Sequence, residues 1–195
     1  MLAALGVEYE AVATDAEELS AGAAPDELVV ENARRKAVAG LKLAGNPIGS
    51  VALGVDTEVV LEGKFLGKAM REEEARERLV ALSGRTHEVL SGVCLAGRRA
   101  STSEGSATTT AHATQRTGVA RSLVTFIELE DRTVERYIAS GEWRDRAGAY
   151  AIQGLGSILV ARLEGDFSNV VGLPLQLLLE LAPELFPAVS RRSSA

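Results

Sequence analysis

Cysteine is almost absent from this chain, because Cys94 is the single cysteine among 195 residues. One cysteine excludes an internal disulfide framework and a cysteine-rich zinc site. Chains without disulfides are typical of reducing compartments, so we expect a cytoplasmic location. Histidine is scarce as well, and neither His87 nor His112 has a histidine or cysteine neighbour at the spacing of metal ligands.

Positive charge is also in short supply. Lysine and arginine number 21 against 27 aspartates and glutamates, which gives a net charge of −6. General binding to DNA or RNA needs a cationic surface, so we do not expect it here. The net charge still leaves room for a local cationic pocket around a small anion.

Long apolar runs and the best-known nucleotide-binding fingerprints are missing too. No apolar stretch approaches the ~20 residues that a membrane-spanning helix needs, and the opening MLAALG lacks the basic leader of a signal peptide. No glycine-rich phosphate loop or dinucleotide-binding motif occurs. The sequence therefore predicts neither a membrane partner nor a site of those two types.

What the chain does have is the composition of a globular protein, with 46% hydrophobic and 25% charged residues. Strand and helix patterns are interleaved, and hairpin signals are too frequent for a purely parallel sheet. We therefore expect a mixed α/β fold with a mixed sheet. The expected strands cover residues 7–12, 51–61, 86–96, 121–129 and 152–163, and the expected helices cover residues 26–44, 71–83, 131–141 and 173–185.

Two segments look less regular. Residues 97–118 are rich in serine, threonine and glycine, which predicts either a mobile loop or the end of a longer hairpin. The polar end of the chain, residues 188–195, is expected to be a disordered tail.

An aspartate interrupts the apolar strand expected at 51–61. A carboxylate in such a strand must be paired, hydrogen-bonded or used in chemistry. Asp56 and its neighbour Thr57 can simply cap a turn at the strand end. However, Lys36 precedes the strand in NARRKA and Lys68 follows it in LGKA, where glycine lets backbone approach a ligand. This pattern favours a phosphate site with a metal ion.

Two further motifs carry polar groups among glycines. In AGAYAIQGLG, Gln153 offers one acceptor and two donors, which suit the edge of a nucleobase, although a surface glutamine in a hairpin turn fits the same pattern. In GDFSNVVGLPL, Ser168 or Asn169 can cap a helix, or the helix N-terminus can receive an anion.

Several segments in order resemble the Maf family of nucleoside triphosphate pyrophosphatases, also called septum formation proteins. They extend over about residues 7–185 and read ENARRKA, GVDTEVVLEGKFLGKA, EEARERLVALSGRTHEVLSGV, VERYIASGEWRDRAGAYAIQGLGS and GDFSNVVGLPL. The resemblance implies a mixed α/β fold similar to the inosine triphosphatase-like pyrophosphatases. It also implies one Maf-like domain over residues 1–187, with two lobes around a cleft.

The resemblance further implies hydrolysis of a nucleotide between its α and β phosphates, with Mg²⁺ or Mn²⁺ as cofactor, as house-cleaning of nucleotides with a link to septum formation and division arrest. The implied roles are proton acceptor and metal ligand for Asp56, metal ligand for Glu18, phosphate binding for Lys36 and Lys68, and substrate selection for Thr57 and Gln153. The threonine and glutamine pair resembles the dTTP/UTP branch, whereas the 7-methyl-GTP branch carries other residues there. The resemblance also leaves a homodimer open.

The chain departs from the family pattern at some positions. Its first residues match the segment after the family's first strand and its LASxSPRRxxLL phosphate loop, so we expect both to be lacking. Ala69 replaces a proline, Arg146 a lysine, and Glu58 a commonly apolar residue. Two alternatives stay open beside the dTTP/UTP enzyme: a nucleotide-binding protein with weak or lost turnover, and a pyrophosphatase for another, modified nucleotide.

Overall fold

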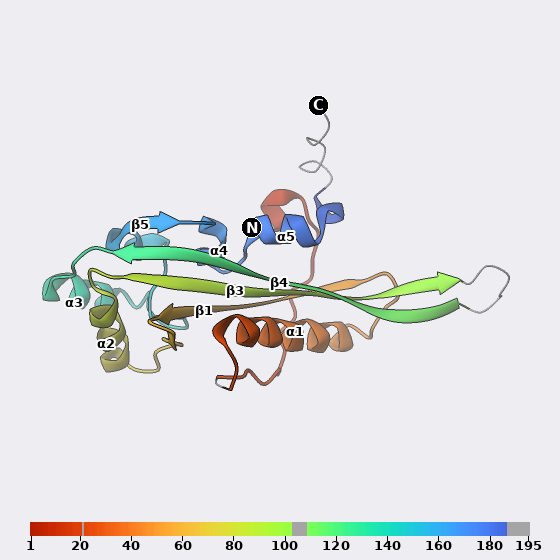
Figure 1. Cartoon of the computed structure of the whole chain (residues 1–195), viewed down its shortest axis with the longest axis horizontal. Coiled ribbons are helices and arrows are strands. Elements are labelled where there is room, and N and C mark those ends of the chain that lie inside the picture. The colour runs from red at the N-terminus through yellow and green to blue at the C-terminus, as the bar shows by residue number, and fades with distance from the viewer. Residues whose placement is uncertain (21, 103–108, 187–195) are drawn as a thin grey trace, which may run out of the picture. The chain divides into compact units, whose positions relative to one another are not determined.

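The computed structural model describes residues 1–20, 22–102 and 109–186 (Figure 1). Its helices are α1 (Pro25–Leu43), α2 (Glu72–Leu82), α3 (Asp131–Ser140), α4 (Phe167–Val171) and α5 (Leu175–Leu181), with short 3-10 turns η1 (Ala3–Leu5), η2 (Gly154–Leu159) and η3 (Pro183–Leu185). Its strands are β1 (Val51–Leu61), β2 (Lys64–Phe65), β3 (Thr86–Thr102), β4 (Thr109–Phe126) and β5 (Val160–Glu164). The tail expected at 188–195 lies outside the described residues.

The strands form one sheet in the order β2-β1-β3-β4-β5. The mixed α/β class is thus confirmed, but the expectation of mixed strand directions within the sheet is wrong. The pairs β1/β2 and β4/β5 are antiparallel, and neighbouring long strands run in opposite directions in Figure 1. The reason is the connections: β1 reaches β2 through Glu62 and Gly63, whose φ angles of 50° and 75° suit a two-residue hairpin. Hairpins this short can join only antiparallel strands.

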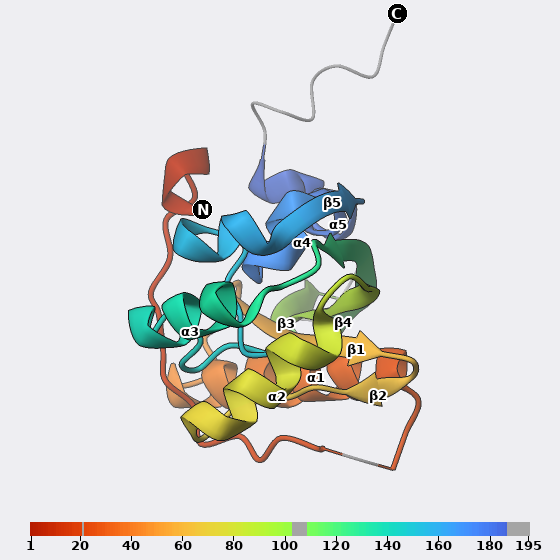
Figure 2. The ribbon, with the colours of Figure 1, turned by 90° about the vertical axis from the view of Figure 1, so that its left-hand side faces the viewer.

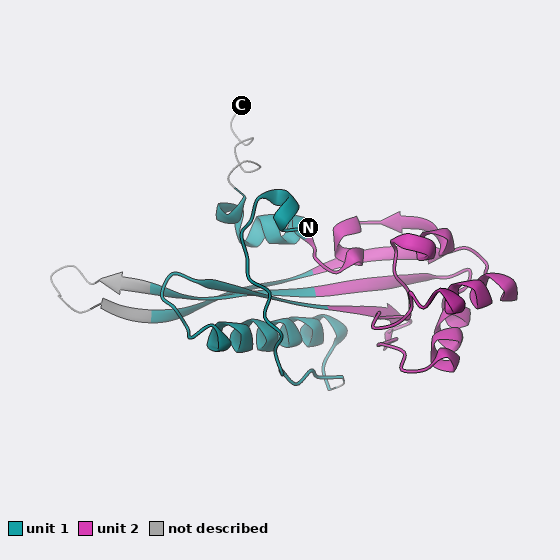
Figure 3. Ribbon diagram, turned by 180° about the vertical axis from the view of Figure 1, so that it is seen from behind, with its two compact units in different colours: residues 1–56, 92–119, 175–195 teal, residues 57–91, 120–174 magenta. Residues whose placement is uncertain are grey.

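The chain divides into two compact units, which Figure 3 colours separately. Unit 1 comprises residues 1–56, 92–119 and 175–195, and unit 2 comprises residues 57–91 and 120–174. Strands β1, β3 and β4 each contribute residues to both units, and β1 passes from one to the other between Asp56 and Thr57.

In unit 1, helix α1 packs so closely on β1 and β3 that backbone atoms of the helix lie against backbone atoms of the strands. A Cβ atom added at Gly54 would lie 2.1 Å from the carbonyl oxygen of Ala33, and one added at Gly92 would lie 2.1 Å from that of Val29. Only glycine permits this approach. A small core of alanines, with Leu41 and Cys94, fills the space beneath the helix.

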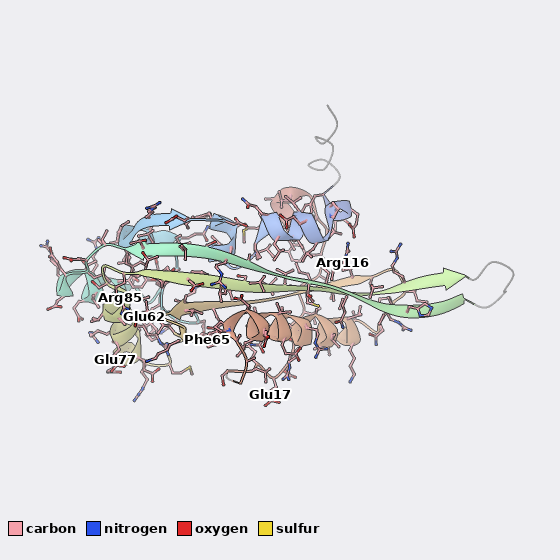
Figure 4. The ribbon with its side chains drawn as sticks, viewed as in Figure 1. Glu17, Glu62, Phe65, Glu77, Arg85 and Arg116 are labelled. Atoms are coloured by element: carbon pink, nitrogen blue, oxygen red, sulfur yellow. The ribbon has the colours of Figure 1, made fainter. Side chains whose placement is uncertain are left out.

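Unit 2 holds the larger hydrophobic core, which gathers aromatic and aliphatic side chains from β1, β3, β4, α2 and α3. Helices α2 and α3 contact one another (Figure 2). Arg76 of α2 forms a bidentate ion pair with Glu135 of α3, with two hydrogen bonds. At the hairpin end, Arg85 pairs with Glu62, and both side chains are labelled in Figure 4. Trp143 and Tyr137 lie fully inside.

Most expected elements are present. The helices at 26–44, 71–83 and 131–141 are confirmed to within two residues, and the strand at 51–61 is confirmed at both ends. Residues 97–102 and 109–118 extend β3 and β4, so the hairpin alternative holds for them. None of the helices among the described residues is long and apolar enough to cross a membrane.

Two expected strands are wrong. Residues 7–12 alternate polar and apolar but form no strand, because the segment lies exposed and pairs with nothing that would bury one face. At 152–163 the turn η2 occupies the first half and only β5 is extended. Gly154 has a φ of 68°, a left-handed conformation that ends any strand there.

Candidate functional site

Asp56 faces helix α1, which explains a carboxylate in an apolar strand. Side chains alternate between the two faces of a strand, so Asp56 shares a face with Gly54, where the backbones of α1 and β1 touch. The carboxylate is only 5% exposed, and a charge buried to that degree needs partners.

Lys36 of α1 supplies the first partner. Its Nζ lies 2.6 Å from Oδ1 of Asp56 and 2.7 Å from Oε1 of Glu18. Burial by itself lowers the pKa of Lys36, but the hydrogen bonds to Asp56 and Glu18 together outweigh it, so the pKa lies above its usual value. The ammonium therefore stays charged between the two carboxylates. The sequence prediction placed all three residues in one site, and the structure brings them together.

Asn32 supplies the second partner, and the sequence pattern did not single it out. Its Nδ2 donates to Oδ2 of Asp56 at 3.1 Å and to the carbonyl of Leu19 at 3.0 Å, while its Oδ1 accepts from the Leu19 amide at 2.7 Å. Asn32 is 1% exposed, so its side chain is shielded from solvent. Its place in ENARRKA, four residues before Lys36 and hence on the same helix face, is the signal that could have found it.

The carboxylates of Glu18 and Asp56, the predicted metal ligands, are groups of the kind that a divalent metal of the magnesium type prefers. Mg²⁺ binds protein through one or two carboxylates and keeps several waters. Glu18 and Asp56 are two such groups, and each has an oxygen within 2.7 Å of a common point, the Nζ of Lys36. Across residues 1–20, 22–102 and 109–186 no cluster of three or more histidine, cysteine or acidic side chains could hold a metal. The metal-ligand roles of Glu18 and Asp56 therefore stay a prediction.

Unit 2 contains a cavity of about 220 Å³ in which three of the predicted residues meet. Thr57, Lys68 and Gln153 all line it, together with Asp145 and Arg146. The remaining lining residues are Val59, Val89, Ala147, Tyr150, Ala151, Ile152, Val170, Val171 and Gly172. Apolar walls with a few polar groups and cations are the usual character of a small-molecule site.

Thr57 reaches the cavity from a buried hydrogen-bond chain. Its Oγ1 lies 2.7 Å from Oγ of Ser91, which also donates to the Asn169 carbonyl at 3.5 Å. Asn169 is fully buried and donates its Nδ2 to the Val89 carbonyl and to Oγ of Ser122. Its expected role as a helix cap is wrong, because Asp166 caps α4 by accepting from the Ser168 amide. Asn169 instead supports the cavity wall.

Gln153 is exposed and directly precedes η2. Both oxygens of the Glu142 carboxylate accept from that turn, Oε1 from the Leu155 amide at 3.0 Å and Oε2 from the Gly156 amide at 3.2 Å. On the other side, the Ala151 amide donates to the Tyr137 hydroxyl at 3.0 Å. The segment that presents Gln153 is therefore held at both ends. The exposure of Gln153 also fits the alternative interpretation, a surface glutamine that takes no part in binding.

His87 lies behind the cavity wall, not in the cavity. It is 2% exposed, and its Nε2 lies 2.9 Å from the hydroxyl of Tyr150, a lining residue. Burial lowers the pKa of His87 to about 4 and raises that of Tyr150 above its usual value. A neutral, hydrogen-bonded histidine of this kind supports the fold.

The comparisons with known proteins agree with one another. The family model described as Maf-like protein matches residues 1–185. A protein of Bacillus cereus (strain ATCC 10987 / NRS 248) named dTTP/UTP pyrophosphatase is 39% identical over 180 residues, which cover 92% of this chain and 80% of that protein. Proteins of the same name from Bacillus thuringiensis subsp. konkukian (strain 97-27) and Bacillus anthracis (strain CDC 684 / NRRL 3495) are 38% and 37% identical, with 92% of this chain and 85% of each relative covered.

Proposed function

The chain belongs to the family of Maf-like proteins, and from this premise we propose that it is a nucleoside triphosphate pyrophosphatase acting on dTTP and UTP. The products are the nucleoside monophosphate and pyrophosphate. The name shared by its relatives supports the reaction and the substrate pair. The observation that carries the proposal is the buried carboxylate of Asp56, held by Lys36 and Asn32 on a largely apolar strand.

The chemistry assigned to Asp56 is removal of a proton from the attacking water. The water oxygen bonds to the α phosphorus, the bond from that phosphorus to the bridging oxygen breaks, and pyrophosphate leaves. General bases of this kind contribute typically ~100- to 10,000-fold to a rate. Asp56 suits the role because Asn32 and Lys36 fix its orientation.

The lysines are assigned to the phosphates. Phosphoryl transfer depends mainly on positioning and on neutralising negative charge, which cations supply. Lys36 keeps its charge, since its pKa is raised by its two carboxylate neighbours. Lys68 lines the cavity of unit 2, where Arg146 adds a second cation in place of the family's lysine.

A divalent cation, Mg²⁺ or Mn²⁺, is assigned to Glu18 and Asp56. When bound, such a cation neutralises phosphate charge and lowers the pKa of a bound water. The two carboxylates already converge on one positively charged point, the ammonium of Lys36. Each offers the hard oxygen ligands that these cations prefer.

Base selection is assigned to Thr57 and Gln153. Their side chains combine hydroxyl and amide groups, which can both donate and accept, and uracil and thymine present both kinds of group on one edge. The cavity that they line has apolar walls for the ring itself. A cytoplasmic nucleotide pool as the source of substrate is part of the same proposal, and a homodimer remains a prediction.

The test is pyrophosphate release by the full chain from a panel of dTTP, UTP, CTP, GTP and 7-methyl-GTP, each with Mg²⁺, with Mn²⁺ and with EDTA. We expect dTTP and UTP to be hydrolysed fastest and EDTA to stop release. Binding of dTTP without release would favour the nucleotide-binding alternative. A preference for 7-methyl-GTP would overturn the assignment of Thr57 and Gln153.

A further inference from the structure

Three residues of α1 hold three consecutive residues of the segment before it. Asn32 bonds both backbone groups of Leu19, Arg35 donates its Nη1 to the Glu17 carbonyl at 3.0 Å, and Lys36 pairs with the Glu18 side chain. Residues 32, 35 and 36 lie on one helix face because they are separated by three and four positions. Figure 4 labels Glu17 in this segment beside α1. The segment is coil, so these contacts fix it in the absence of secondary structure.

Asn32 is distinct from the other two because it also reaches Asp56. The oxygen and the nitrogen of its side-chain amide are both hydrogen-bonded. Oδ1 accepts from the Leu19 amide, and Nδ2 donates to the Leu19 carbonyl and to Oδ2 of Asp56. The bond from the Leu19 amide also fixes which end of the side chain is nitrogen. One buried amide thus joins the backbone beside Glu18 to the carboxylate of Asp56.

We propose that Asn32 is a positioning residue. It fixes the segment around Glu18 and the Asp56 carboxylate relative to each other, so that both face Lys36. The role in turnover rests on the proposed function, whereas the hold on Leu19 does not. A neutral amide is the suitable side chain, because it can donate to a carboxylate and to a carbonyl while it accepts from an amide. Aspartate can only accept when ionised, and leucine can do neither.

The experiment compares Asn32→Asp and Asn32→Leu with the unaltered chain. Amide hydrogen exchange of Leu19, measured without nucleotide, reports the hold on the segment. Pyrophosphate release from dTTP reports the hold on Asp56. We expect Asn32→Leu to lose the protection of Leu19, and Asn32→Asp to keep part of it through the remaining acceptor. Both should lower kcat by about tenfold to a hundredfold with a smaller change in KM, as outer-shell changes at metal and active sites do.

Two further variants serve as controls. Asn46→Asp makes the same chemical change at a partly exposed turn of unit 1 and should leave both readouts as they are. Arg35→Ala removes the bond to the Glu17 carbonyl without touching Asp56, so it should loosen the segment and lower kcat less than Asn32→Leu does. If Asn32→Leu does not fold, Asn32→Asp and Arg35→Ala carry the comparison.

The outcomes separate the two proposals. Unchanged Leu19 exchange in a folded Asn32→Leu chain, or kcat within twofold of the unaltered chain in both Asn32 variants, overturns the positioning role. If the unaltered chain releases no pyrophosphate from any nucleotide, the proposed function fails, and the exchange of Leu19 still decides whether Asn32 holds the segment.

Discussion

Lys36 lies 2.6 Å from Asp56, measured from Nζ to Oδ1, and this ion pair joins helix α1 to strand β1. The carboxylate is almost fully buried and the lysine about one quarter exposed. Removing one charge of such a pair leaves the other uncompensated, which is costly to stability. Substitutions that keep the shape of the carboxyl group are therefore the informative ones.

Asp56→Asn should reduce pyrophosphate release at least ~100-fold while nucleotide binding persists. The amide keeps an oxygen for the bond from Lys36 but cannot take up the proton of a water. An assay of pyrophosphate release measures the turnover, and calorimetry measures the binding of dTTP. Asp131→Asn, at the exposed start of α3, is the matched control. Turnover close to that of the control would end the proton-acceptor role.

Gln153→Glu should change the ratio of the dTTP rate to the 7-methyl-GTP rate by about tenfold, in favour of the second substrate. A glutamate loses the two amide donors, and a donor lost from a base contact costs roughly 1–3 kcal/mol. Rates with both nucleotides give the ratio directly. Gln115→Glu on β4, also exposed but remote in sequence from every assigned residue, should not alter it. An unchanged ratio for Gln153→Glu removes this residue from base selection.

Gly54→Ala should destabilise the protein by about 1–3 kcal/mol or more, because the new methyl group would overlap the α1 backbone. The contact distances of 2.1 Å and 2.6 Å, to the Ala33 oxygen and the Ala37 nitrogen, leave no room for it. Urea unfolding measures the change. Gly67→Ala, where an added Cβ meets nothing within 4 Å, is the control and should lie near zero. Equal effects would mean that α1 and β1 tolerate separation.

Stability should fall as the pH is lowered from about 6.5 to about 4, in part because of His87. The unfolded chain takes up the imidazole proton near pH 6.5, whereas the folded chain does so only near its lowered pKa of about 4. Protons therefore bind preferentially to the unfolded form in that interval. The loss amounts to at most roughly 3 kcal/mol at 1.36 kcal/mol per pKa unit.

His87→Gln is the comparison for this pH effect, since glutamine can still bond the Tyr150 hydroxyl without titrating. Urea unfolding at pH 7 and at pH 4.5 should show a smaller difference for the variant than for the unaltered chain. The same difference in both chains would assign the pH dependence to carboxylates alone.

The sequence predicted the regular elements where pattern and burial coincide. Helix α1 and strand β1 have clear apolar spacing and clear ends, so they were predicted closely. Residues 7–12 show that alternation alone is insufficient, because a strand also needs a paired edge. The antiparallel sheet could not be read from strand patterns, since direction depends on how the connections close.

Sequence reasoning singled out the charged residues around Asp56 but missed residues whose side chains bond backbone groups. Glu18, Lys36 and Asp56 stand out as charges, and the structure places them within hydrogen-bonding reach of one another. Asn32 and Glu142 act on backbone groups, at Leu19 and at Leu155 and Gly156 respectively. Contacts from a side chain to a distant backbone depend on the fold and leave little trace in spacing.

Asp56 and Thr57 are consecutive in β1, so their side chains project from opposite faces of the strand. A slip of one position would present the hydroxyl to Lys36 and turn the carboxylate to the opposite face of the strand, the face from which Thr57 reaches Ser91. Deleting one residue upstream of Asp56 would therefore exchange the faces on which the two side chains lie without removing either. Two features fix the position of the strand and prevent that exchange: the close contact at Gly54 and the turn at Glu62 and Gly63. Insertions and deletions within residues 51–61 should therefore be tolerated far less than substitutions.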